Sequence, residues 1–199
     1  MQNFNANIIQ IFYRKYITNK YISLVEPIIE NILNKPSNPY NYKPTTFGFN
    51  NNNYKALLNA SYKVKQRQNR EGYISQIVLG NFFSWEDLGV GHESGLDIIK
   101  KDKSMIGEIK NKFNTMNSKN KTQVLNELSK YKKENPNCLC FLGIVNPKSR
   151  PIKKKIIHNG QELWEYHGYE LYKLVFTYNG YNYTELVIPK IQEIINNNY

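Results

Sequence analysis

The residues best able to do chemistry are three charged side chains in the middle of the chain. The sequence contains only three aspartates, Asp87, Asp97 and Asp102, and Asp97 opens a short apolar run. Glu108 and Lys110 follow in a second apolar run, two residues apart. Alternate residues of a β-strand point to one face, so Glu108 and Lys110 are predicted to share a face.

The two apolar runs are predicted to form a hairpin. Residues 96–101 and 105–110 have strand-like patterning, and a turn at residues 102–103 joins them. A two-residue turn places Asp97 directly opposite Glu108, with Cβ atoms roughly 4.5–5.5 Å apart. A slip of one residue in the pairing would send these side chains to opposite faces.

Facing carboxylates favour a metal site. Asp97 and Glu108 repel one another at this separation unless a cation lies between them. Mg²⁺ prefers oxygen ligands, commonly one or two carboxylates together with water and substrate phosphate oxygens. Lys110 would then orient a water molecule or stabilise charge that develops on a phosphate. The sequence therefore predicts metal-assisted hydrolysis of a phosphate ester.

The surrounding elements predict an α/β fold with a central mixed β-sheet flanked by helices. Helices are expected at 8–34 (broken or kinked at Pro27), 54–83 (with a candidate break near 69–72), 120–134 and 189–196, and the core strands at 86–88, 96–101, 105–110 and 138–145. β-Hairpins are expected at 156–166 and 169–187, with turns at Asn159-Gly160 and Asn179-Gly180. Residues 1–199 are predicted to be one domain, with N-terminal helices and loop (1–53), catalytic core (54–146) and C-terminal hairpins with a short helix (147–199).

A known signature matches this arrangement. Gly95-Leu-Asp97, ten further residues and Glu108-Ile-Lys110 resemble the signature of the PD-(D/E)XK nuclease superfamily, with Leu96 where that signature often has proline. The resemblance covers residues 71–145. The run Glu108-Ile-Lys-Asn-Lys-Phe-Asn-Thr-Met-Asn117 is similar to a segment of type II restriction endonucleases that cut GGNCC-type sites.

The resemblance implies roles for individual residues. Asp97 and Glu108 become ligands of Mg²⁺, with the carbonyl of Ile109 as a further ligand, and Lys110 positions or activates the attacking water. Superfamily members often add an acid from the preceding helix, for which Glu71 is the candidate. A solvated helix carboxylate is an equally good interpretation of Glu71.

The charge of the chain favours a polyanionic partner. There are 27 Lys and Arg against 16 Asp and Glu, a net charge of +11. Residues 100–121 and 147–158 each carry a local charge of +5, which suits contacts to the backbone of double-stranded DNA. The predicted DNA-binding residues are Lys112, Asn114, Thr115, Asn117, Lys119, Lys121, Arg150, Lys153, Lys154 and Lys155.

Three function classes stay open from the residues alone. They are a site-specific restriction endonuclease, a structure-specific or repair nuclease on the same scaffold, and a non-catalytic basic nucleic-acid-binding domain. The first class implies a homodimer on a palindromic site, built from the N-terminal helices or the C-terminal hairpins, and a methyltransferase that protects host DNA. Two cysteines at i and i+2, Cys138 and Cys140, do not suit a disulfide, and no apolar run approaches a membrane span, so a reduced, cytoplasmic protein is expected.

Overall fold

The computed structural model describes residues 2–35, 52–89, 91–112, 118–147 and 150–198. Its centre is a six-stranded mixed sheet, which confirms the predicted fold class. In spatial order the strands are β1 (Trp85–Asp87), β2 (Ile98–Lys100), β3 (Met105–Lys112), β4 (Leu139–Asn146), β6 (Gln161–His167) and β5 (Ile152–His158). β3, β4 and β6 run parallel, whereas β1, β2 and β5 pair antiparallel with their neighbours.

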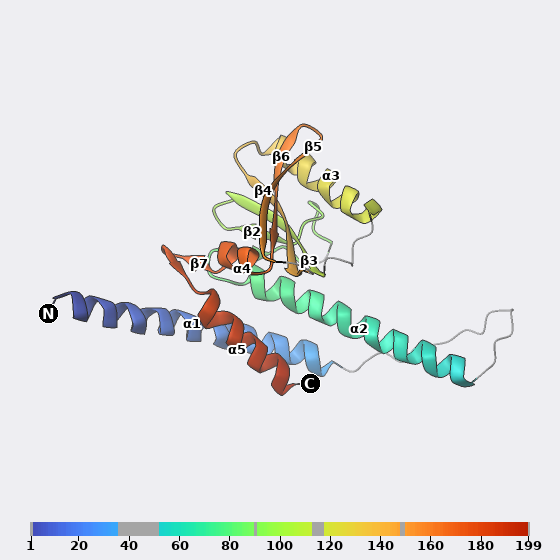
Figure 1. Cartoon of the computed structure of the whole chain (residues 1–199), viewed down its shortest axis with the longest axis horizontal. Helices are drawn as coiled ribbons and strands as arrows, with labels where there is room; N and C mark the ends of the chain where they lie inside the picture. Colours follow the sequence, from blue (N-terminus) through green and yellow to red (C-terminus); the bar gives the residue numbers. More distant parts are fainter. Residues whose placement is uncertain (1, 36–51, 90, 113–117, 148–149, 199) are drawn as a thin grey trace.

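Helices cover the two faces of the sheet unequally (Figure 1). A single helix, α3 (Ser118–Glu134), packs on one face, called here the α3 face. The opposite side holds α1 (Gln2–Asn34), α2 (Asn52–Gly80), α4 (Tyr169–Val175) and α5 (Thr184–Asn197). α1 and α2 extend well beyond the sheet, in opposite directions.

Alternation along the strands divides the core into two clusters. Ile109 of β3 and Phe141 of β4 are buried with the four helices, while Ile106 and Leu142 are buried with α3. The parity of β3 therefore places Glu108 and Lys110 on the α3 face. Cys138 and Cys140 lie in the α3 cluster as free, buried thiols.

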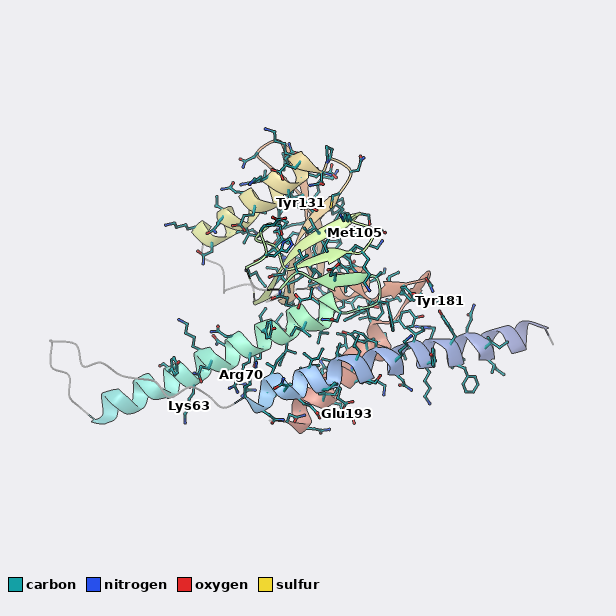
Figure 2. The ribbon with its side chains drawn as sticks, turned by 180° about the vertical axis from the view of Figure 1, so that it is seen from behind. Lys63, Arg70, Met105, Tyr131, Tyr181 and Glu193 are labelled. Carbon is teal, nitrogen blue, oxygen red and sulfur yellow. The ribbon has the colours of Figure 1, made fainter. Side chains whose placement is uncertain are left out.

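The first and last helices pack together although they are distant in sequence. Tyr21 of α1 is fully buried in one cluster with Val187 and Ile191 of α5. Tyr181 lies just before α5 in the sequence, and its hydroxyl accepts a hydrogen bond from the side-chain amide of Gln10 in α1 at 2.8 Å. Figure 2 shows Tyr181 beside α1. The N- and C-terminal segments thus form one layer beneath the sheet.

The structure corrects several predicted boundaries. Pro27 lies inside one continuous α1, and α2 is likewise unbroken near Gly72. Residues 169–187 are not one long hairpin. The predicted turn at Asn179-Gly180 joins only the two-residue strands β7 (Thr177–Tyr178) and β8 (Tyr181–Asn182), while α4 and α5 flank them.

Residues 169–175 form a helix, not a strand, because their buried side chains have helical spacing, although many of these residue types are common in strands. Leu171 and Val175 are both fully buried and four residues apart, which is the spacing of one helix face. Tyrosine and valine in this segment favour strands by propensity, but tertiary packing outweighs that weak preference. In the part of the chain described, no helix has both the length and the apolar character needed to cross a membrane.

Candidate active site

The hairpin register brings the two candidate carboxylates together. Ile98 pairs with Gly107 and Ile99 with Ile106, which is the register that sets Asp97 opposite Glu108. The N–H of Ile109 donates to Oδ2 of Asp97 at 2.7 Å and fixes that carboxylate just before the start of β2. The predicted hairpin is confirmed, but its connection is longer than the predicted two-residue turn, because β2 ends at Lys100 and β3 begins at Met105. Lys103 in this connection adopts a positive φ of 57°.

Glu108 is held in an electrostatically unfavourable position. The residue is 6% exposed. Burial, followed by the negative charge of Asp97, raises the pKa of Glu108 to about 7, and the neighbouring Lys110 only partly opposes this. Lys110 donates to Oε1 of Glu108. The other oxygen, Oε2, is buried without a hydrogen-bond partner among the described residues.

Asp97 has a similar environment. Burial raises its pKa, and the hydrogen bond from Ile109 together with the charge of Lys110 only partly offsets that effect. Asp87 of β1 raises it further. Carboxylates kept at elevated pKa beside one another are typical of functional sites, because a structural role would not require the repulsion.

The donor set fits a hard divalent cation that keeps part of its water. Among the described residues no group of three or more His, Cys, Asp and Glu side chains surrounds a common point. A pair of carboxylates is nevertheless enough for Mg²⁺, which takes its remaining ligands from water and phosphate. In a strand the N–H and C=O of one residue point to the same side. The carbonyl of Ile109 is therefore directed toward the side on which Asp97 accepts from its N–H.

Glu71 lies on the other side of the sheet from Glu108. It pairs with Arg67 at 3.2 Å and accepts from Asn111 of β3 at 3.5 Å. Asn111 in turn accepts from Asn146 of β4 at 2.7 Å. These residues lie at a cavity of about 390 Å³ that is otherwise lined largely by aliphatic side chains of α2 and α5. The structure groups Glu71 with two amides rather than with the carboxylate pair.

The predicted DNA-binding residues divide into separate surfaces. Lys119 and Arg150 are exposed. Lys154 faces α3, where its ammonium lies 3.3 Å from Glu165. Lys153 and Lys155 point to the opposite face, over the ring of Trp164 at 5.1 and 5.7 Å.

Part of the predicted set lies outside the described residues. Asn114, Thr115 and Asn117 are in the segment 113–117, and the side chain of Lys112 is likewise not described. Their assignment to DNA binding stays a prediction.

Two buried polar residues of the α3 face were not predicted from the sequence. Glu165 is fully buried and His167 is 2% exposed, and Nε2 of His167 lies 2.7 Å from Oε1 of Glu165. Lys121 of α3 donates to both oxygens of Glu165 at 3.2 Å. Strand alternation shows that Leu163, Glu165 and His167 share a face, but no local pattern shows that this face is covered.

Comparison with known families defines the class of protein to which this fold belongs. Residues 47–187 match the model of a family of restriction endonucleases, and Asp97, Glu108 and Lys110 all fall inside the match. The family is described as Eco47II restriction endonuclease, and because the match covers most of the 199 residues, the chain belongs to it. Membership implies a site-specific deoxyribonuclease whose substrate is DNA. No curated protein sequence matches the chain.

Proposed function

We propose that the chain is a type II restriction endonuclease with a PD-(D/E)XK active site, which hydrolyses a specific double-stranded sequence of the GGNCC type with Mg²⁺. The observation that carries this proposal is the carboxylate pair formed by half-buried Asp97 and buried Glu108, with Lys110 on the same sheet face as Glu108. Membership in a restriction endonuclease family supports it independently.

In this proposal the chain supplies the ligands and the positioning groups. Asp97, Glu108 and the Ile109 carbonyl would hold Mg²⁺, which when bound supplies positive charge against the oxygens of the scissile phosphate. Ile109 fixes the orientation of Asp97 through its N–H. Lys110 orients the attacking water, whose oxygen bonds to phosphorus as one P–O ester bond of the backbone breaks. Glu71 supports Asn111 at the end of β3 rather than joining the ligands.

Incubation of the protein with phage DNA and Mg²⁺ tests the proposal. A site-specific enzyme gives discrete bands, and the Glu108→Ala variant gives none while keeping the wild-type circular dichroism spectrum. Structure-dependent nicks would indicate the repair-nuclease class instead, and absence of cutting by the wild type would indicate a binding domain. Cutting by Glu108→Ala at the wild-type rate would show that the site is misassigned.

The active form is proposed to be a homodimer. A palindromic site presents two equivalent scissile bonds related by a two-fold axis, and an isologous dimer matches that symmetry. The N-terminal part of α1 carries a stripe of large exposed side chains at helical spacing, formed by Ile9, Phe12 and Tyr16, which are 67%, 67% and 62% exposed. Large apolar side chains that are exposed along one side of a helix favour a protein–protein contact there. A DNA methyltransferase of matching specificity is the proposed functional partner, since the host genome needs protection.

A further inference from the structure

The α3 face holds a second charged cluster that the hydrolytic site does not use. Its centre is Glu165 of β6, which is fully buried and forms a hydrogen bond with His167. Lys121 of α3 and Lys154 of β5 both lie against Oε2 of this carboxylate, at 3.2 and 3.3 Å. Two ammonium groups therefore lie within contact distance of one oxygen atom.

The sheet register places this cluster beside the candidate active site. Glu108 pairs with Leu142, and Leu142 pairs with Glu165, so the two carboxylates occupy one row of the sheet, separated by one strand. Two strand spacings amount to about 10 Å. Lys110 and His167 flank Ile144 in the same way, one residue pair further along the same strands.

The topology also places the Glu165 cluster near the end of the sheet at which β3, the strand of Glu108, terminates. β3, β4 and β6 are parallel, so their carboxyl ends lie at one edge of the sheet. Lys121 lies in the first turn of α3, which begins at Ser118 shortly after β3 ends. Lys154 lies near the start of β5, which is antiparallel to β6 and reaches the same edge.

The charges of the cluster suit an anion. One carboxylate faces two ammonium groups, so a positive charge remains even with neutral His167. Each ammonium has three donors, and the lysine side chains are 33% and 50% exposed, which leaves donors available to solvent. Without the carboxylate between them, two ammonium groups this close would repel one another and separate.

We propose that Glu165, supported by His167, positions Lys121 and Lys154 as a binding site for a second backbone phosphate of the DNA that crosses the Glu108 site. This proposal rests on the proposed function and extends it, because a phosphate held two strands away from Glu108 fixes the position of the DNA relative to the scissile phosphate. Glu165 and His167 are positioning residues that do not touch DNA.

Binding of a short random-sequence duplex at several salt concentrations in EDTA tests the proposal without cleavage. Lys121→Met and Lys154→Met should each flatten the slope of log K against log salt by about 0.9, the value for one lost phosphate contact. Lys121→Arg and Lys154→Arg should retain the wild-type slope. Lys133→Met, an exposed lysine in the last turn of α3, is the matched control and should leave the slope unchanged.

Glu165→Gln distinguishes positioning from simple charge. The change makes the cluster more positive, so an unpositioned pair of lysines would bind DNA more tightly and with a steeper salt slope. The proposal predicts weaker binding and a flatter slope than for the wild type. Binding by Glu165→Gln as tight as wild type, or lysine variants that keep the full slope, would overturn the proposal. If Glu165→Gln does not fold, the variants of the partly exposed Lys121 and Lys154 decide the result.

A cleavage assay with Mg²⁺ separates this proposal from the proposed function. A wild-type protein that cuts DNA while the lysine variants bind with unchanged slopes rejects only the second phosphate site. A wild-type protein that does not cut rejects the nuclease assignment, whatever the slopes.

Discussion

Two buried glutamates on the α3 face have opposite electrostatic surroundings. Burial by itself raises the pKa of a carboxyl group, and at Glu108 the charge of Asp97 adds to that effect. At Glu165 the hydrogen bond from His167 and two lysine charges outweigh burial, so its pKa lies below the ordinary value. Glu108 therefore destabilises the fold when ionised, whereas Glu165 is stabilised in its ionised form. A raised pKa in the metal-free protein, as at Glu108, is what we expect of a carboxylate that binds a cation.

The first prediction concerns the stability of the metal-free protein. The pKa of Glu108 rises from 4.5 to about 7 on folding, so within that window the folded state holds a proton that the unfolded state has released. Stability of the wild type should therefore fall as pH rises through the window. Glu108→Gln should be more stable than the wild type above pH 7, by up to about 3 kcal/mol, and no more stable below pH 4.5. Urea unfolding in EDTA at several pH values measures this.

Addition of Mg²⁺ to the same two proteins provides the control. A cation that binds only the folded state raises the melting temperature, and the wild type should show this rise above pH 7. Glu108→Gln should not respond. An equal rise in both proteins would place the metal elsewhere.

Lys110 gives a second prediction at this scale. Lys110→Met should lower the single-turnover rate of DNA cleavage at saturating protein by about 10²–10⁴-fold, because a positioned charged group is lost from the reacting phosphate. Lys110 also opposes the raised pKa of Glu108. Its loss should shift the acidic limb of the pH–rate profile to higher pH. Lys133→Met, at the far end of α3, should change neither the rate nor the profile.

The carboxylate pair was predictable from the sequence and the lysine-bound Glu165 was not. Asp97 and Glu108 are joined by a short turn, so local pairing rules fix their opposition. Glu165 meets Lys121 across 44 positions of sequence, and this contact depends on the insertion of β6 between β4 and β5. That strand order is a long-range property without a local signature.

At the scale of elements, Gly107 of β3 leaves the space in which the Phe141 ring of the neighbouring strand β4 packs. A Cβ on Gly107 would lie 2.3 Å from the ring of Phe141 on the neighbouring strand. Gly107 immediately precedes Glu108, so the closeness of this packing also fixes the position of the strand that carries Glu108.

Gly107→Ala is therefore expected to destabilise the protein by about 1–3 kcal/mol, as overpacking of a core does. Combining it with Phe141→Leu should cost less than the sum of the two changes, because the clash is removed. Gly72→Ala on α2 is the control, where the nearest atom to a new Cβ is 3.9 Å away. That change should stabilise the helix slightly. Additive costs in urea unfolding would contradict the assigned contact.

Most elements of residues 54–146 follow from the sequence, and the C-terminal region does not. β3, α3 and β4 have clear periodicity and were placed within about two residues of their bounds. α4 spans only seven residues, Tyr169–Val175, too few for helical periodicity to outweigh the strand preference of its aromatic and branched side chains.

At the scale of the whole molecule, the exposed stripe on α1 gives a prediction about assembly. Phe12→Lys should convert a dimer into a monomer in light scattering, because it buries a charge at the centre of the proposed interface. The variant should nick cognate DNA rather than cut both strands. Val64→Lys, at a 55% exposed position on α2, should stay dimeric. A wild-type monomer, both free and on cognate DNA, would contradict the homodimer.

The packing of α1 against α5 affects how the chain folds while it is being synthesised. Gln10 and Tyr181, which bond to one another, are 171 positions apart in the sequence. Contacts of such long range form late, since a long loop must close before they contribute. During synthesis α1 emerges early and stays without its cover until α5 has been made and has docked. The nascent chain therefore passes through a stage in which the apolar side of α1 is open to chaperones. If the sheet needs this layer to hold the hairpin in place, cutting activity appears only some time after the chain has been synthesised.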